Sequence, residues 1–596
     1  MLNLQPSNPL RIAVLVKQIP KFEEMRIDSA GRLIRDGVEL HMNDYCRRAV
    51  RTGCDLALAS EGSCTVITLG PPESHTVLRE AILCGCKNAL QISDPAFAGS
   101  DTLATAKALS AALKKTGPWD LVLCGRNSID ADTGQVPAQV AELLDLPLLA
   151  GVRELTIQGE SINALLEHDD EWIRVNASFP AVLSCAERLC DPCKIKDPEA
   201  WTTVDSNLIS IFTAKDLGPG PWGQEASPTW VGDTQILDID RAGHRFESDT
   251  DLAIEQMVDV INDRWKSEIN PETTKRKVPT ATGNYPEIWV ITEPNREKNT
   301  AELIGTAAHL AESLEGAVVA ITPVETDSKK LASQGADKIL ELCSTDEQTI
   351  VRSIDKASGD QPPWGLLAPG TDWGRQVAGR LAVRWNSGLT GDAVGLEIRE
   401  GRLIAFKPAF GGQLVAEISY SSFTQMATVR PGVLSVPKPR TPTTILVTRV
   451  NSETDSRIQV ENRWKDDNAD LLANATIVIG VGQGVDPNDY PILEKLAKKL
   501  GAEICATRKV TDQGWMPRAR QVGITGHTIA PNLYIALGTS GKFNHMVGVR
   551  SAGTIVGINP DPQCELWEWC DIGFVGDWHK IFEKLVFQLT KTGVII

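Results

Sequence analysis

The sequence lacks the long apolar runs and the excess of positive charge that would assign it to a membrane or to nucleic acid. No stretch approaches the roughly 18 uninterrupted apolar residues of a membrane-spanning helix. The early apolar run at 12–16 is too short for the core of a signal peptide. With 77 acidic against 60 basic side chains, the net charge is −17, which argues against a nucleic-acid surface. We therefore expect a cytoplasmic protein with no membrane span and no nucleic-acid partner.

The thirteen cysteines do not suggest a disulfide framework, because their count is odd and they are spread over a long chain. We expect reduced thiols. Cys185, Cys190 and Cys193 have the C-x4-C-x2-C spacing that can begin an iron–sulfur or zinc site. No nearby fourth cysteine completes that spacing, although Cys46 or Cys124 could do so through the fold. The favoured interpretation is loop and strand-end thiols without a metal.

One strand–helix–strand plan occurs twice along the chain. Short, β-branched runs typical of buried parallel strands occur at 11–17, 65–70 and 120–125, and similar runs occur at 286–293, 317–322 and 364–370. Helices are predicted after the third run of each set, at about 134–144 and 374–385. The sequence therefore predicts two related domains.

Polar, irregular stretches divide the chain. One lies at 263–285, and a second at 451–470 precedes a new alternating pattern that begins at Ala475. At about 100–200 residues per domain, we expect a first domain at 1–262, a linker at 263–285, and further domains at 286–450 and 451–596. The predicted fold class is α/β, with two related parallel-sheet domains of nucleotide-binding type and a C-terminal doubly wound domain.

The last domain begins with a strand that ends in glycines, ATIVIGVGQG at 475–484. Such a turn lets backbone N–H groups approach a phosphate at the start of the following helix, although glycine turns of this spacing also occur without a ligand. Polar clusters also follow the predicted strands at 504–506, 533–537 and 554–558. Because ligands of open parallel sheets lie beyond the carboxyl ends of the strands, we expect a dinucleotide at this edge.

Several longer motifs resemble one known family. The segments KPAFGG at 407–412, TQMATVRPG at 424–432, QVGITG at 521–526 and APNLYIA at 530–536 resemble the α subunit of electron transfer flavoproteins. The first 262 residues resemble the β subunit through VKQIP at 16–20, HMN at 41–43, GP at 70–71 and SIDADTGQ at 128–135. Together the two resemblances cover nearly the whole chain, with a β-like part followed by an α-like part.

The resemblance implies an FAD site in the last domain. Its residues would be Gln483, Thr507, Arg508, Gln521, Val522, Gly523, Ile524, Thr525, Ser540, Gly541, Lys542, Phe543, Asn544, His545, Asn559, Asp577 and Trp578. Arg508, Thr525 and His545 match family residues beside the flavin ring. There Arg508 would favour negative charge on the ring, Thr525 would bond near N5, and His545 would donate to the carbonyl near N1.

Two residues depart from the family pattern. Gln483 stands where the family has an arginine in the first glycine turn, so a charged contact with the FAD phosphate is lost. Ile524 stands where a glutamine is usual, so a polar contact near N5 is lost. We expect FAD to bind, with an altered redox potential.

A second nucleotide site is implied in the β-like part, where ordinary members of the family hold AMP and electron-bifurcating members hold a second FAD. The matching residues are Leu15, Asn43, Asp44, Tyr45, Cys46, Leu69, Asn127, Asp130, Asp132, Thr133, Gly134, Gln135 and Val136. A polar loop after a strand suits a nucleotide, whereas an uncommitted surface turn is the alternative. We expect AMP, with a second FAD as the alternative.

The resemblance implies an electron carrier. FAD would accept electrons from a flavin-dependent dehydrogenase and pass them to a quinone oxidoreductase or another redox protein. The usual partner-docking segment is replaced by CDPC at 190–193 and DPEAWTT at 197–203, which indicates an altered partner surface. An electron-bifurcating NADH oxidoreductase and a non-redox nucleotide-binding module remain as alternatives.

Overall fold

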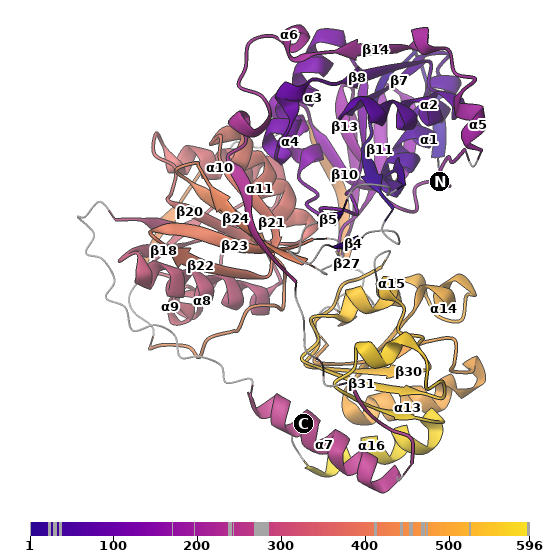
Figure 1. Cartoon of the computed structure of the whole chain (residues 1–596). Coiled ribbons are helices and arrows are strands. Elements are labelled where there is room, and N and C mark those ends of the chain that lie inside the picture. The colour runs from indigo at the N-terminus through magenta and orange to yellow at the C-terminus, as the bar shows by residue number, and fades with distance from the viewer. Residues whose placement is uncertain are drawn as a thin grey trace. The chain divides into compact units, whose positions relative to one another are not determined.

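The structure is a computed structural model that divides into two compact units (Figure 1). One unit is Met1–Ile236 with Glu272–Trp464, and the other is Leu237–Pro271 with Lys465–Ile596. The structure describes residues 2–21, 26–27, 33–34, 39–169, 171–195, 197–236, 241, 243–248, 250–267, 285–409, 414–441, 445–451, 457–465, 471–472, 475–523 and 526–592. None of the helices in these ranges is long and apolar enough to cross a membrane.

The first repeat forms an eleven-stranded sheet whose central strands are parallel. The strand order is β14 (Ile209–Phe212), β8 (Asn88–Ile92), β7 (Ser63–Leu69), β2 (Arg11–Leu15), β9 (Leu121–Gly125), β13 (Ala181–Cys185), β10 (Leu148–Gly159), β11 (Ser161–Glu167), β12 (Glu171–Ser178) and β27 (Ile458–Lys465), and β1 (Leu2–Pro6) pairs with β10. Smaller elements are the pairs β3 (Gln18–Pro20) with β6 (Leu40–Met42) and β4 (Arg26–Ile27) with β5 (Leu33–Ile34), and the short helices α5 (Pro198–Trp201) and α6 (Ala214–Leu217).

Four helices cover the two faces of this sheet. They are α1 (Asp44–Ala59) and α2 (His75–Leu83) on one face, and α3 (Thr102–Thr116) and α4 (Val136–Leu144) on the other. Successive residues of β2 alternate between the two cores, as the two-residue period of a strand requires: Ile12 and Val14 pack with α1 and α2, whereas Ala13 and Leu15 pack with α3 and α4. The apolar run at 12–16 is therefore buried, with side chains on both faces of the sheet, as predicted for a parallel strand.

The second repeat has the same plan around a seven-stranded parallel sheet. Its strand order is β21 (Gly388–Ala393), β25 (Gln425–Val429), β20 (Gly365–Pro369), β17 (Glu287–Ile291), β18 (Ala317–Thr322), β19 (Lys338–Glu341) and β26 (Leu446–Arg449). Its helices are α8 (Glu297–Ser313), α9 (Ser328–Gln334), α10 (Glu347–Ser358) and α11 (Asp372–Arg384). A four-stranded antiparallel sheet of β15 (Thr229–Ile236), β24 (Leu414–Tyr420), β23 (Arg402–Ala409) and β22 (Gly395–Arg399) belongs to this half.

The two repeats exchange strands. β15 comes from the first half of the chain but pairs with β24 of the second repeat. In return, β27 follows the second repeat in sequence but extends the first sheet beside β12. The prediction that 451–470 is irregular was therefore wrong for β27. Its side chains are mostly exposed, so the strand lacks the apolar alternation from which it could have been recognised.

The second unit is a doubly wound α/β domain around a six-stranded parallel sheet. The order is β16 (His244–Phe246), β32 (Ile572–Val575), β31 (Thr554–Asn559), β30 (Leu533–Leu537), β28 (Ile477–Val481) and β29 (Glu503–Ala506). Its helices are α7 (Thr250–Ser267), α13 (Tyr490–Leu500), α14 (Arg508–Asp512), α15 (Phe543–Met546) and α16 (Trp578–Thr592). The predicted fold class is confirmed.

The second unit also contains a segment that the sequence assigned to the first domain. β16 pairs with β32, and α7 contributes Ile254, Met257 and Ile261 to the same core as Leu585 of α16. The division between the units therefore falls near Ile236, before the boundary expected at residue 262. No local pattern in the sequence indicates that α7 packs on the sheet of the second unit.

The thiols also differ from expectation. Cys84 and Cys193 form a disulfide that joins positions 109 residues apart, so the expectation of reduced thiols was wrong for this pair. Cys193 therefore does not share a free-thiol site with Cys185 and Cys190. Cys185 is buried on β13, and the Cys190 sulfur lies 3.5 Å from the Thr52 hydroxyl.

Candidate nucleotide sites

The first candidate site lies at the carboxyl edge of the six-stranded sheet in the second unit. Two of its turns, at 482–484 and 538–541, pack backbone against backbone: Gly484 N donates to Gly538 O at 3.1 Å. A Cβ on Gly482 would lie 2.1 Å from Gly538 O, and Gly538 itself has φ +58° with Gly484 backbone atoms 2.8 Å from a would-be Cβ. The glycines in these turns are therefore required by contact between the turns, with or without a ligand.

Thr539 lies in the second of these turns, where it faces Gly482, and was not among the predicted site residues. Its side chain is 1% exposed, and its hydroxyl has no hydrogen-bond partner among the described residues. The Asn559 amide donates to the Thr539 carbonyl at 2.6 Å, and the Asn559 Oδ1 accepts from Asp561 N at 2.8 Å. A buried hydroxyl without a partner is unfavourable, so this position suits a polar ligand atom. The sequence signal was available, because Thr539 directly precedes Ser540 and Gly541, which are among the predicted FAD residues.

The segment 521–523 is held by buried polar contacts. The Thr511 hydroxyl donates to Gln521 Oε1 at 2.8 Å, and His545 Nδ1 lies 2.9 Å from the Val522 carbonyl. Since that carbonyl can only accept, Nδ1 carries the proton and Nε2 accepts from the Tyr534 hydroxyl at 2.6 Å. Burial lowers the pKa of His545 to about 4, so the ring is neutral near pH 7. Both of its nitrogens are engaged within the protein, so donation to a flavin would require one of these bonds to change.

The other predicted FAD residues differ in exposure. Gln483, Ser540, Lys542 and Asn544 are exposed at the same edge, and Gly541 is buried. Thr507 precedes α14 and donates its N–H to the Val481 carbonyl at 3.0 Å. Trp578 is buried in the core, and its ring stacks on His579. Ile524 and Thr525 lie outside the described residues, and so does the side chain of Phe543.

Two charged residues of this edge are paired only at the surface. Arg508 is 65% exposed and its Nε lies 3.3 Å from Asp512, one helical turn away. The Asp577 carboxylate accepts from His579 N at 3.0 Å and pairs with the His579 ring at 2.8 Å. Exposed pairs of this kind contribute little to stability, so both side chains can exchange them for a ligand.

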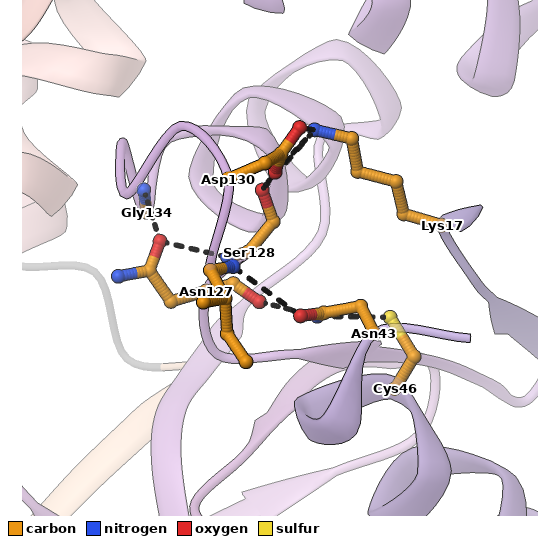
Figure 2. A network of polar contacts seen from close by, with 8 residues as sticks. Lys17, Asn43, Cys46, Asn127, Ser128, Asp130 and Gly134 are labelled. Atoms are coloured by element: carbon orange, nitrogen blue, oxygen red, sulfur yellow. Dashed lines mark hydrogen bonds and ion pairs between the residues drawn. The ribbon is translucent and has the colours of Figure 1, made fainter. Parts of the chain in front are cut away.

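The second candidate site is the loop between β9 and α4 in the first unit, which Figure 2 shows from close by. Asn127 organises this loop: its Oδ1 accepts from the backbone N–H groups of Ser128 and Gly134, each at 2.9 Å. Its amide also donates to Asp132, which has a positive φ of 47°. One side chain thus closes the loop on itself.

Asn43 ties this loop to the start of α1. Its amide donates to the Asn127 carbonyl at 2.8 Å, and its Oδ1 accepts from Ile129 N at 3.3 Å (Figure 2). The same amide lies 3.5 Å from the Cys46 sulfur. Asn43 and Cys46 are buried, whereas the Asp44 carboxylate is 58% exposed. Burial raises the pKa of Tyr45 well above its usual value.

Lys17 provides a positive charge at this site and was not among its predicted residues. Its ammonium lies 2.7 Å from Asp130 and 3.1 Å from the Ser128 hydroxyl (Figure 2). Burial alone would raise the pKa of Asp130, but the Lys17 charge and hydrogen bonds lower it. The signal for Lys17 was its place directly after the first strand, where a side chain reaches the carboxyl edge.

Five of the predicted AMP residues face elsewhere. Gln135 is fully buried; its Oε1 accepts from the Thr102 hydroxyl at 2.7 Å, and its amide donates to the Leu389 carbonyl at 3.3 Å. Leu15 belongs to the core between the sheet and α3, and Leu69 and Val136 pack against that core. Thr133 lies beside Gly391 of the second repeat. The structure therefore brings Asn43, Cys46, Asn127, Asp130, Asp132 and Gly134 together at the loop.

Buried charges from the second repeat lie behind the loop. A Cβ on Gly134 would lie 3.3 Å from Arg375, which is 3.7 Å from Asp392. Lys407 donates to the Gly391 carbonyl at 3.0 Å, and burial lowers the pKa of Lys407. Burial alone would raise the pKa of Asp392, but Arg430 and Arg375 lower it. Sequence reasoning missed these residues, because they belong to the other repeat.

Comparisons with known proteins match separate segments of the chain to two family models. The sequence matches the electron transfer flavoprotein domain over residues 30–207 and 288–454, and the electron transfer flavoprotein FAD-binding domain over 471–550. It is 35% identical over 326 residues to the electron transfer flavoprotein subunit alpha of Thermoanaerobacterium thermosaccharolyticum, covering 52% of this chain and 99% of the relative. It is 35% identical over 258 residues to the subunit beta of that organism, covering 43% and 99%. Protein FixB of Clostridium saccharobutylicum is 32% identical over 326 residues, covering 51% and 96%.

Proposed function

The chain belongs to the electron transfer flavoprotein family, with the β-like and α-like parts in one polypeptide, and from this we propose the direction of its electron transfer. FAD in the second unit accepts electrons from a flavin-dependent dehydrogenase. The acceptor is a quinone oxidoreductase or another redox protein. The observation that carries the proposal is the carboxyl edge of the six-stranded sheet, where glycine turns meet a buried hydroxyl with no hydrogen-bond partner in the part of the chain that the structure describes.

The residues of this edge suit FAD. Ser540 offers an exposed hydroxyl, Gly541 a backbone N–H, and Thr539 a hydroxyl that a polar atom would satisfy. When bound, FAD supplies the ability to take up two electrons and release them one at a time. The protein contributes position and electrostatics at that edge.

We assign Arg508 the role of tuning the flavin. Its exposed surface pair with Asp512 leaves the guanidinium available to a nearby anionic group. Arg508→Ala should keep FAD bound but lower its reduction potential, and Arg508→Lys should restore most of the shift. Photoreduction with a reference dye measures the potential. An unchanged potential in Arg508→Ala would show that this charge is remote from the ring.

For the loop at 127–136 we propose AMP. Lys17 matches a phosphate in charge, and the donors and acceptors of Asn43 and Asn127 suit a small polar ligand. A carrier needs only one flavin, which the second unit holds. The nucleotide at this loop would therefore take no part in electron transfer and would stabilise the fold of the loop.

The number and identity of the bound nucleotides test the proposal. Acid release from the purified chain, followed by chromatography, should give one FAD and one AMP, and NADH alone should not bleach the flavin rapidly. Two FAD per chain with rapid bleaching by NADH would replace the carrier by an electron-bifurcating oxidoreductase. A colourless protein that takes up no FAD would identify a non-redox nucleotide-binding module.

A further inference from the structure

Three cysteines from neighbouring elements of the chain meet in the first unit, outside both nucleotide sites. Cys54 lies on α1, Cys64 on β7, and Cys86 in the turn between α2 and β8. Their sulfurs all lie within 4.8 Å of one another, with 3.7 Å between Cys54 and Cys86 and 3.5 Å between Cys64 and Cys86. None of the three takes part in the Cys84–Cys193 disulfide.

The surrounding backbone builds this cluster. Gly53 lets α1 approach the sheet, since a Cβ there would lie 3.0 Å from the Cys64 sulfur and 2.7 Å from Val14. Gly85 has φ +118°, and a Cβ there would lie 3.4 Å from the Cys54 sulfur. The left-handed turn at Gly85 thus directs Cys86 toward the other two thiols. Cys64 and Cys86 are 1% and 4% exposed, whereas Cys54 is only partly buried.

We propose that Cys54, Cys64 and Cys86 form a three-thiolate site for a soft d10 metal cation, Cu(I) or Zn(II). Thiolates are the ligands that select such cations. Tetrahedral Zn–S bonds of about 2.3 Å place neighbouring sulfurs about 3.8 Å apart, and a trigonal site places them about 4.0 Å apart. The sulfur–sulfur distances of 3.7 Å for Cys54 and Cys86 and 3.5 Å for Cys64 and Cys86 lie within about 0.5 Å of these values.

The three thiols perturb one another. Hydrogen bonds from Cys64 and Cys86 lower the pKa of the Cys54 thiol. The hydrogen bond with Cys54 raises the pKa of Cys64 and of Cys86 well above the ordinary value of a thiol. A bound metal would displace the thiol protons to solvent, because the thiolate and not the thiol is the metal ligand.

The site has three protein ligands and an open side. No fourth histidine, cysteine or carboxylate joins the group among the residues that the structure places. Cys54 is the partly exposed ligand, so it marks the entry path for the ion. A trigonal site of three thiolates suits Cu(I), and the same site with a water in the fourth position suits Zn(II).

Titration of the intact, nucleotide-loaded chain with Cd(II) tests the proposal. Under anaerobic conditions with a phosphine reductant, one Cd(II) per chain should bind and give a thiolate-to-metal charge-transfer absorption, read as a difference spectrum against the flavin. Cys54→Ser and Cys64→Ser should each weaken binding at least tenfold. Cys190→Ser, which removes a partly buried thiol of the same domain, should leave it unchanged.

A second measurement uses the wild-type chain, so it does not depend on whether a variant folds. Metal bound to the wild-type chain should protect Cys54 from alkylation, as read by peptide mass spectrometry. Competition with chelators of known affinity then separates Cu(I) from Zn(II). Three results would overturn the proposal: no charge-transfer band, equal binding by Cys54→Ser and wild type, or a disulfide between two of the three thiols that forms in place of the metal complex.

Discussion

The two candidate sites are built in different ways. The edge of the second unit is shaped by backbone: glycine turns at 482–484 and 538–541 are in contact, and one buried hydroxyl faces no partner among the described residues. The loop of the first unit is shaped by side chains: Asn127 closes it, Asn43 anchors it, and Lys17 pairs with Asp130. A backbone site should fail when a Cβ is added, whereas a side-chain site should fail when a donor is removed.

The largest expected effect is that of a Cβ at Gly538. This residue and Gly501 have nearly equal φ angles, +58° and +62°. A Cβ at Gly538 would lie 2.8 Å from Gly484, whereas a Cβ at Gly501 would meet no atom of the described residues within 4 Å. Gly501→Ala should cost about 1 kcal/mol from its backbone conformation alone. Gly538→Ala should cost about 1–3 kcal/mol more, because the turns must separate, and it should lose FAD. Thermal unfolding and flavin retention on gel filtration measure both effects.

Equal losses in the two glycine variants would contradict this contact. FAD retained in Gly538→Ala with a large loss of stability would show that the turns are close for packing alone. The pair thus separates the strain of a left-handed residue from the shape of the site.

The next effect is expected at the side-chain site. Asn127→Ala leaves the N–H groups of Ser128 and Gly134 without an acceptor and should weaken AMP by about 1–3 kcal/mol, roughly 5- to 150-fold. Asn176→Ala is the matched control, because it removes hydrogen bonds to Ser161 and Asn163 on another part of the same sheet. Calorimetry on nucleotide-free protein gives both affinities. A loss of AMP affinity in Asn176→Ala as large as in Asn127→Ala would mean that the loop has no special part in binding.

The way each site is built decides how much of it the sequence could reveal. Strands were located closely: 533–537 was predicted and β30 spans Leu533–Leu537. Glycines after such strands pointed to the backbone site, because glycine placement follows local geometry. Several side-chain contacts of the loop join distant positions, such as Lys17 with Asp130 and Asn43 with Asn127. The family resemblance indicated Asn43, Asn127 and Asp130 but not Lys17.

Pairings between distant segments explain the remaining errors. β15 and β27 join sheets of the opposite repeat, and β16 joins the second unit, although no local pattern tells a strand which partner to choose. The cysteines also meet through the fold and not through their local spacing. The sequence drew attention to Cys185, Cys190 and Cys193, which are close in sequence, whereas the thiols that meet are Cys54, Cys64 and Cys86.

A smaller effect is expected from the unpaired hydroxyl of the backbone site. Thr539→Val keeps the shape of the side chain but removes an oxygen that lacks a partner among the described residues. The FAD-free chain should be as stable as wild type or slightly more stable, whereas FAD should bind about 1 kcal/mol more weakly. Unfolding of the FAD-free chain and FAD titration separate the two effects. A destabilised FAD-free chain would show that the hydroxyl is already satisfied, and unchanged FAD affinity would show that FAD does not use it.

The smallest effect is expected at the ion pair of the side-chain site. Lys17 is 45% exposed, so its pair with Asp130 should contribute less than about 1 kcal/mol. Because the folded state lowers the pKa of Asp130, this contribution is fully present above the unfolded value of about 3.9 and is lost as the pH falls through the lower folded value. The difference in melting temperature between wild type and Lys17→Met should therefore stay constant from about pH 7 to 5 and shrink below about pH 4. In an Asp130→Asn background, Lys17→Met should show no such dependence on pH. A difference that grows on acidification, or that persists without Asp130, would show that Lys17 acts through another partner.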